Sequence, residues 1–255
     1  MQDYFKIENL KCSYNKGQKV VLEIEKLEIP RGKVVFIVGP SGCGKSTILE
    51  TLGLMNDTLL VENNTTFLFS PSSEDGREID CTKIWAEGNA QLSRLRKDNF
   101  SFIFQNTNLM EQFSIIENAE ISKQIKGGSK SYGEVMRQVG LDQVLDERKE
   151  KVGELSGGQK QRLAFVRAFL PDFKIIFGDE PTGNLDPENA DTLIGLMVDE
   201  VKSTEKTAII VSHTPELYNK YADIIITIHC KKRENGDTYG LINADSVKIN
   251  EKSVE

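Results

Sequence analysis

Residues 34–47 read VVFIVGPSGCGKST, a short apolar run followed directly by a glycine-rich loop. The loop, residues 39–46, fits the pattern G-x-x-x-x-G-K-[ST], and the helix-like stretch TILETLGL begins at residue 47. Glycines allow backbone N–H groups to turn inward around phosphate oxygens, which side chains would obstruct. The order of strand, loop and helix therefore predicts an α/β fold with a phosphate-binding loop.

Further apolar runs rich in β-branched residues recur along the chain between helical patterns. They are residues 102–104 (FIF), 175–177 (IIF), 208–211 (AIIV) and 224–228 (IIITI). Such runs are typical of buried strands in a mostly parallel sheet with crossover helices. Residues 34–38 supply a fifth strand of the same kind.

The remaining segments indicate smaller units around this core. Residues 4–12 and 20–28 alternate between apolar and polar side chains, which predicts a separate antiparallel sheet. Residues from about 106 to 150 have helical patterns interrupted by glycines, which predicts an inserted helical subdomain. The polar, turn-rich segment 56–82 is expected to be strand and loop, and KKRENGDTYG after residue 230 is expected to be a turn or hairpin.

Composition restricts the partners of the chain. The 255 residues carry a formal net charge of -7, so no general electrostatic attraction to nucleic acid or anionic lipid is expected. No apolar run approaches the ~18 residues needed to cross a bilayer, so any membrane role requires a partner. Cys12, Cys43, Cys81 and Cys230 have no CxxC spacing, and no signal segment begins the chain. Reduced cysteines are therefore expected.

The phosphate loop and one strand end together predict a site for Mg²⁺ and a triphosphate. Lys45 is expected to neutralise charge on the β- and γ-phosphates, and the hydroxyl of Ser46 to ligate Mg²⁺. Asp179 follows an apolar run, which places it at the carboxyl edge of the sheet as a second metal ligand. Glu180, one residue further, is free to polarise an attacking water. Without the loop, the same pair would be read as a solvated strand end.

A second stretch with phosphate-binding character is ELSGGQKQR, residues 154–162. It is a hydroxyl-bearing, glycine-rich turn at the start of a predicted helix, where backbone N–H groups favour anions. The alternative interpretation is a plain helix N-terminus capped by Ser156. One nucleotide has no evident need for two such loops in one chain.

Five stretches in this order resemble the nucleotide-binding subunits of ABC ATPases. They are GPSGCGKST (39–47), FQ (104–105), LSGGQ (155–159), IIFGDEPTGNLD (175–186) and VSH (211–213). FQNTNLMEQFSIIENAEI and DEPTGNLD are most similar to the branch that serves lipoprotein release, macrolide export and bacterial cell division. Thr214 stands where the family usually has Asp, and residues 56–82 lack the family's usual proline and glycine pattern.

The resemblance implies an ABC ATPase domain over residues 1–230, with a helical subdomain at about 106–165 and a polar C-terminal extension at 231–255. It implies a Mg²⁺-dependent ATPase that forms a head-to-tail homodimer with ATP. The LSGGQ of one subunit would close over ATP held by the other subunit. It further implies an integral membrane permease subunit as partner and a cytoplasmic, peripheral location on the inner face of the cell membrane, with no nucleic acid expected. Two alternatives are a soluble ABC ATPase acting on an assembly complex or nucleic acid, and a non-catalytic ATP-binding scaffold.

The resemblance also implies roles for individual residues. Tyr14 would stack on adenine, Gln105 would reach Mg²⁺ and the attacking water, and His213 would contact the γ-phosphate. Asp186 would cross the dimer interface, although NLDPENA also predicts a helix N-cap there. The implied catalytic residues are Lys45, Gln105, Glu180 and His213. The implied metal ligands are Ser46, Gln105 and Asp179. The implied ATP-binding residues are Tyr14, Gly39, Ser41, Gly42, Cys43, Gly44, Lys45, Ser46, Thr47, Ser156, Gly157, Gly158, Gln159 and Asp186.

Overall fold

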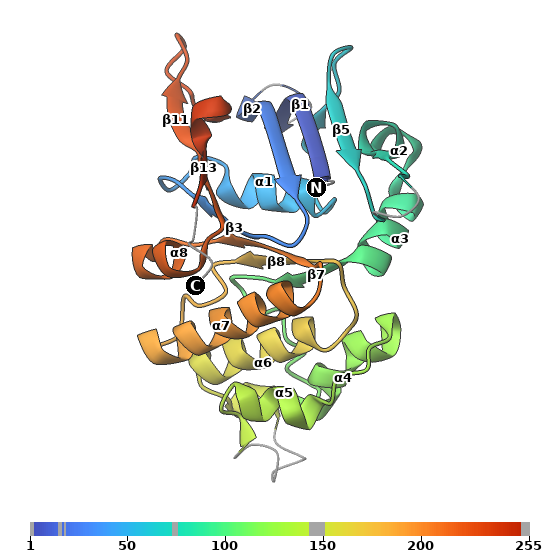
Figure 1. Ribbon diagram of the computed structural model, residues 1–255, viewed down its shortest axis with the longest axis vertical. Coiled ribbons are helices and arrows are strands. Elements are labelled where there is room, and N and C mark those ends of the chain that lie inside the picture. Colours follow the sequence, from blue (N-terminus) through green and yellow to red (C-terminus); the bar gives the residue numbers. More distant parts are fainter. Residues whose placement is uncertain (1–2, 15–16, 18, 73–75, 143–150, 251–255) are drawn as a thin grey trace.

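The computed structural model describes residues 3–14, 17, 19–72, 76–142 and 151–250, and it is built in layers. Down the long axis in Figure 1, a mostly antiparallel sheet lies above helix α1, a second sheet follows, and helices α4 to α7 lie below that sheet. The helices are α1 (Lys45–Leu52), α2 (Cys81–Glu87), α3 (Asn89–Asn99), α4 (Ile115–Lys126), α5 (Tyr132–Gln138), α6 (Gly157–Phe169), α7 (Pro187–Ser203) and α8 (Pro215–Tyr221). Single 3₁₀ turns cover Val152–Glu154 and Ala244–Ser246.

The lower sheet carries the fold predicted from the apolar runs. Its strand order is β13-β10-β3-β9-β8-β7, and every pair is parallel except β13 with β10. Because both faces of the sheet are covered, its parallel strands are mostly apolar, and all five residues of β9 are buried. The predicted α/β class is confirmed. The strands are β3 (Val34–Val38), β7 (Phe100–Ile103), β8 (Ile175–Asp179), β9 (Thr207–Val211), β10 (Ile224–Thr227) and β13 (Val247–Ile249).

The upper sheet contains the predicted antiparallel pair, and both strands are longer than expected. Its strand order is β11-β12-β2-β1-β5-β6, with β4 also paired to β1. The segment 56–82 supplies β4, β5 and β6 and then leads into α2. The strands are β1 (Asp3–Tyr14), β2 (Lys19–Pro30), β4 (Leu59–Leu60), β5 (Thr66–Phe69), β6 (Ile79–Asp80), β11 (His229–Lys232) and β12 (Thr238–Ile242).

The C-terminal residues belong to both sheets. Strands β11 and β12 form the predicted hairpin, β12 then runs parallel to β2, and β13 pairs with β10. The hairpin also packs on the phosphate loop, because a side chain at Gly240 would collide with the backbone carbonyl of Cys43. The phosphate loop is therefore supported by the hairpin of β11 and β12.

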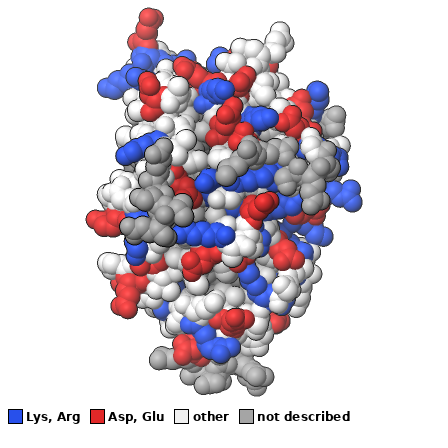
Figure 2. Space-filling model, viewed as in Figure 1, with Lys and Arg blue, Asp and Glu red and all other residues white. Residues whose placement is uncertain are grey.

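Three helices in the lower layer begin at capped residues. Ser114 and Ser156 each form a capping box, with Glu117 and Gln159 respectively, and Asp186 caps α7 ahead of Pro187. In the part of the chain that the structure describes, no helix is both long and apolar enough to cross a membrane. Figure 2 shows acidic and basic side chains interspersed on the visible face.

Candidate nucleotide site

The glycine-rich loop between β3 and α1 adopts the curled conformation that its glycines predict. Gly42 and Gly44 have φ angles of 76° and 88°, in the left-handed region that favours glycine. Lys45 is largely buried, and its Nζ donates hydrogen bonds to the carbonyl oxygens of Gly39 at 3.1 Å and Pro40 at 2.9 Å. The loop thus holds its lysine folded back over its own backbone.

A cleft of about 380 Å³ lies over this loop. The ends of three parallel strands contribute side chains to it: Gln105 follows β7, Glu180 follows β8, and His213 follows β9. This edge is where open α/β sheets bind ligands. The lining residues are Tyr14, Val21, Ser41, Gly42, Gly44, Lys45, Ser46, Thr47, Gln105, Glu180 and His213.

Asp179 and Ser46 lie next to each other beside the cleft. Burial raises the pKa of the Asp179 carboxyl above its ordinary value, and the neighbouring Ser46 hydroxyl partly offsets that rise. A carboxylate beside a hydroxyl suits Mg²⁺, which keeps several waters and takes few protein ligands besides substrate phosphates. Within the described residues no cluster of three or more His, Cys, Asp or Glu could hold a metal by itself. The residues present therefore fit a Mg²⁺ ion bound together with phosphate.

Glu180 is held between the two neighbouring strand ends. Its Oε2 accepts a hydrogen bond from Gln105 Nε2 at 3.2 Å, and its Oε1 lies 3.0 Å from His213 Nε2. The backbone of Glu180 has φ 47°, an uncommon value for a residue other than glycine, and such values cluster at functional sites. Burial lowers the pKa of Lys45, while the charges of Glu180 and Asp179 raise it. The carboxylates thus favour the charged form of this lysine.

The comparisons with known proteins agree with this geometry. Residues 22–183 match the protein family described as ABC transporter. The chain belongs to the ABC transporter family. A lipoprotein-releasing system ATP-binding protein, LolD, of Paramagnetospirillum magneticum is 32% identical over 218 residues, covering 83% of this chain and 89% of that protein. LolD of Hyphomonas neptunium is 34% identical over 214 residues, covering 83% and 87%.

Solved structures support the same assignment for this ABC ATPase. The dimeric ABC transporter cassette MJ0796 superposes with a TM-score of 0.70 and 26% identity, covering 88% of this chain and 93% of that one. A dimeric post-hydrolysis form of MJ0796 bound to ADP and Pi superposes with a TM-score of 0.69 and 25% identity over the same shares. The fold that the resemblance implied is confirmed.

Tyr14, the residue implied to stack on adenine in this ABC ATPase, lies at the rim of the cleft. It is 45% exposed, and its hydroxyl is 3.3 Å from Thr47 Oγ1. A large aromatic ring left this exposed next to the phosphate loop is available for stacking on a flat ligand. Stacking on adenine remains a prediction.

The second glycine-rich stretch of the ABC ATPase lies apart from this cleft. Ser156 and Gly157 are exposed, and no residue from 156 to 159 lines the cleft. Ser156 Oγ accepts a hydrogen bond from the Gln159 backbone N–H at 3.2 Å, so the capping interpretation is correct. Asp186 is likewise off the cleft and accepts a hydrogen bond from the Asn189 backbone N–H at 3.0 Å, which lowers its pKa. Residues 156–157 and Asp186 are therefore exposed to solvent.

The expectation of reduced cysteines is wrong for two of the four. Cys43, in the phosphate loop, forms a disulfide with Cys230, and their Cα atoms are 5.6 Å apart. The pairing arises because β3 and β10 are neighbours, so the loop after β3 meets β11 after β10. The sequence separation of 187 residues concealed this contact. Cys12 and Cys81 are free and buried.

Removing this disulfide is expected to destabilise the ABC ATPase. Cys230→Ser should lower the free energy of unfolding by about 2–5 kcal/mol, because the cross-link closes a very long loop in the unfolded chain. Urea unfolding without reductant measures the difference. Dithiothreitol should bring the wild-type protein to the stability of the variant and leave the variant unchanged. A wild-type protein whose stability is insensitive to reductant would contradict the expected contribution.

Two other residues, Gln161 and Arg167, were not predicted from the sequence. Gln161 is fully buried beneath the cleft, although its neighbours Lys160 and Arg162 make its position resemble a solvated helix face. Arg167 donates hydrogen bonds to the carbonyl oxygens of Thr107 and Asn108, just after Gln105. The burial of Gln161 and the hydrogen bonds of Arg167 are both set by loops packed against α6, which the helical pattern of α6 does not reveal.

Proposed function

We propose that this ABC ATPase hydrolyses Mg²⁺-ATP as a head-to-tail homodimer and thereby moves an integral membrane permease subunit from a peripheral position on the cytoplasmic face. The observation that carries the proposal is the placement of Glu180 between Gln105 and His213, above the loop that holds Lys45. The similar MJ0796 cassette is dimeric, which supports the homodimer.

The residues of the cleft have distinct roles in the proposed reaction. Lys45 and the loop amides bind the β- and γ-phosphates and offset their charge. Glu180 accepts a hydrogen bond from the attacking water and orients it, while Gln105 and His213 hold the carboxylate in place. Ser46 and Asp179 would hold Mg²⁺, which would supply charge stabilisation for the transferred phosphoryl group.

The outward position of residues 156–158 supports the dimer. Their backbone amides lie at the N-terminus of the 13-residue helix α6, where the helix dipole favours an anion. They cannot serve the cleft of their own subunit, which they do not line. In the proposed dimer they close over the γ-phosphate in the cleft of the other subunit. One nucleotide is then held by two glycine-rich stretches from two chains.

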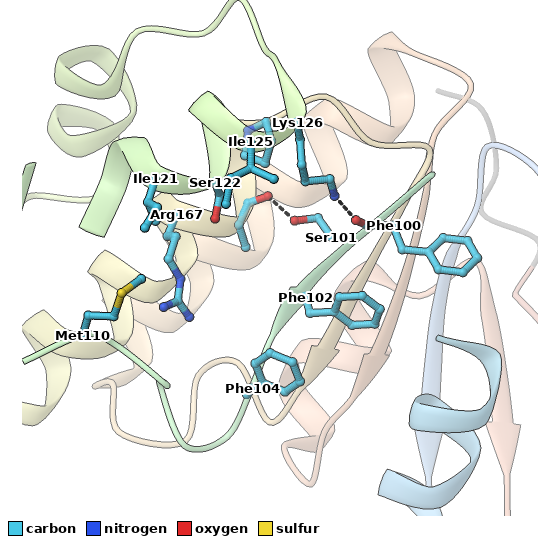
Figure 3. Close-up of a pocket in the computed structure, with 12 residues that line it drawn as sticks. Phe100, Ser101, Phe102, Phe104, Met110, Ile121, Ser122, Ile125, Lys126 and Arg167 are labelled. Atoms are coloured by element: carbon cyan, nitrogen blue, oxygen red, sulfur yellow. Dashed lines mark hydrogen bonds between the residues drawn. The ribbon is translucent and has the colours of Figure 1, made fainter. Parts of the chain in front are cut away.

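A groove beside Gln105 is the proposed docking site for the permease. It has a volume of about 290 Å³ and lies between β7, α4 and the end of α6. Phe102 and Phe104, in and just after β7, line it together with Ile121 and Ile125 of α4, and Figure 3 shows these residues with Arg167 of α6. Ile125 is 59% exposed beside this groove, so its apolar side chain is accessible to a partner.

The groove and the catalytic cleft are lined by neighbouring residues of one segment. Phe104 lines the groove and the next residue, Gln105, lines the cleft. Arg167 also lines the groove and binds the segment that follows Gln105 at 2.6 and 2.8 Å. A side chain of the permease inserted in this groove would therefore contact residues next to Gln105, and a change in the position of Gln105 would alter that contact. The LolD relatives are ATP-binding proteins of lipoprotein-releasing systems, which supports lipoprotein release as the class of work performed.

Ile125→Asp tests this partner assignment. The charge is expected to reduce co-purification of an integral membrane protein from solubilised membranes by at least ~10-fold, because apolar anchors at interfaces contribute about 2 kcal/mol or more. Val61→Asp is the matched control, since Val61 is 54% exposed in the upper sheet region. ATP hydrolysis by both isolated variants should equal that of wild type. Equal recovery of the membrane protein by both variants would contradict docking at the groove.

A further inference from the structure

Gln161 joins the helix that begins at Ser156 to the catalytic residue of the same subunit. Its side chain is 1% exposed, and both of its polar ends are hydrogen-bonded. Nε2 donates to the backbone carbonyl of Glu180 at 3.0 Å, and Oε1 accepts from the Asn184 backbone N–H at 2.8 Å. A buried amide with both ends satisfied fixes the two segments that it bridges.

The backbone of Glu180 needs such support. Its φ of 47° is unfavourable for a residue with a side chain, so the conformation persists only where the surroundings enforce it. The Glu180 N–H donates to the Val211 carbonyl at 3.0 Å, and the Glu180 carbonyl accepts from Gly183 N–H at 3.2 Å as well as from Gln161. Gln161 is the side chain among these partners, and it comes from the helix that carries the second glycine-rich stretch.

Two further contacts bind the start of α6 to the segment after Glu180. A Cβ at Gly158 would lie 3.3 Å from the Asn184 carbonyl oxygen, so the helix and the loop are in close backbone contact there. Arg162 donates to Asn189 Oδ1 at 3.0 Å, and Asn189 is hydrogen-bonded to Asp186. The first turns of α6 and residues 180–189 therefore form one connected unit.

We infer that Gln161 is a positioning residue that transmits engagement of residues 156–158 to the orientation of Glu180 in the same subunit. The inference rests on the proposed head-to-tail dimer. In that dimer, the N-terminus of α6 contacts the ATP of the partner subunit, while Glu180 acts on the ATP of its own subunit. Gln161 thus connects the two nucleotide sites through a single side chain, and closure at one site sets the catalytic carboxylate at the other.

Gln161→Met tests the inference, because methionine has a similar length and removes both hydrogen bonds. We expect kcat for ATP hydrolysis to fall roughly 10²-fold, as is typical when a catalytic group shifts by about 1 Å. The KM for ATP should be unchanged, since Gln161 does not line the cleft. The same substitution added to Glu180→Gln should leave the ATP-dependent dimer intact.

Two more variants separate positioning from folding. Thr207→Val also removes a buried hydrogen bond, from Thr207 Oγ1 to the Pro30 carbonyl at 3.3 Å, but at the amino end of β9, away from the cleft, and should keep wild-type kcat. Gln161→Glu keeps an acceptor for Asn184 and loses the donor for Glu180, so it should lose kcat as well, and it decides the question if the methionine variant does not fold. Wild-type kcat in a folded Gln161 variant would overturn the inference. A wild-type protein that neither hydrolyses ATP nor dimerises would instead refute the proposed function.

Discussion

Replacing Glu180 by glutamine is expected to reduce ATP hydrolysis by about 10²–10⁴-fold, the usual contribution of a positioned general base. The amide can still accept the hydrogen bond from Gln105 Nε2, which the carboxylate accepts at 3.2 Å, so the geometry of the cleft should persist. What is lost is the negative charge that draws a proton from water. Steady-state phosphate release measures the effect.

Binding measurements show whether Glu180→Gln acts on the chemical step alone. The affinity for ATP should be within the wild-type range, because Lys45 and the loop amides are untouched. A dimer should accumulate with Mg²⁺-ATP, since the two subunits no longer dissociate after hydrolysis. Glu134→Gln removes an exposed carboxylate on α5 and serves as the matched control. Near-normal turnover by Glu180→Gln would refute the assignment of the base.

Ser156→Arg is expected to abolish the ATP-dependent dimer while leaving ATP binding by the monomer intact. Ser156 is exposed and does not line the cleft of its own subunit, so a longer side chain meets nothing there. In the proposed dimer, the arginine would enter the space between the two subunits and prevent closure. Size-exclusion chromatography of the variant in a Glu180→Gln background, with and without Mg²⁺-ATP, measures the dimer.

The helix cap must be separated from the contact with the partner subunit. Ser156 Oγ accepts a hydrogen bond from the Gln159 backbone N–H, and losing such a cap costs about 1 kcal/mol. Ser156→Ala removes the same cap without adding bulk, so it should show that loss of stability and still dimerise. If Ser156→Arg also forms the dimer with ATP, residues 156–158 do not close on the partner's nucleotide.

The parallel sheet was predictable because a strand covered on both faces has no polar side. Each of its five parallel strands contains or overlaps an apolar run in the sequence, and residues 34–38 match β3 in both bounds. The cleft could be predicted for the same reason, since Gln105, Glu180 and His213 each come within three residues after an apolar run. Strand adjacency does not appear in a sequence, so the disulfide between Cys43 and Cys230 could not be inferred.

Residues that act through buried contacts between elements also could not be predicted from the sequence. Gln161 is polar and has charged neighbours, and only the position of the Glu180 and Asn184 backbones makes it an interior residue. The hydrogen bonds of Arg167 similarly depend on where the backbone carbonyl groups of residues 107 and 108 lie. A pattern along one helix reports which face is apolar, whereas these side chains are defined by the loops packed against that helix.

The central claim is that the two glycine-rich stretches of different subunits meet on one nucleotide. Two single-cysteine additions test it directly: Ser41→Cys in one tagged chain and Ser156→Cys in another, both in the Glu180→Gln background. Ser41 and Ser156 are exposed, whereas the native free cysteines, Cys12 and Cys81, are buried. A short bismaleimide should link residue 41 of one chain to residue 156 of the other with Mg²⁺-ATP and not with ADP. Absence of that link with ATP, or a link between two copies of residue 156 in its place, would contradict the account.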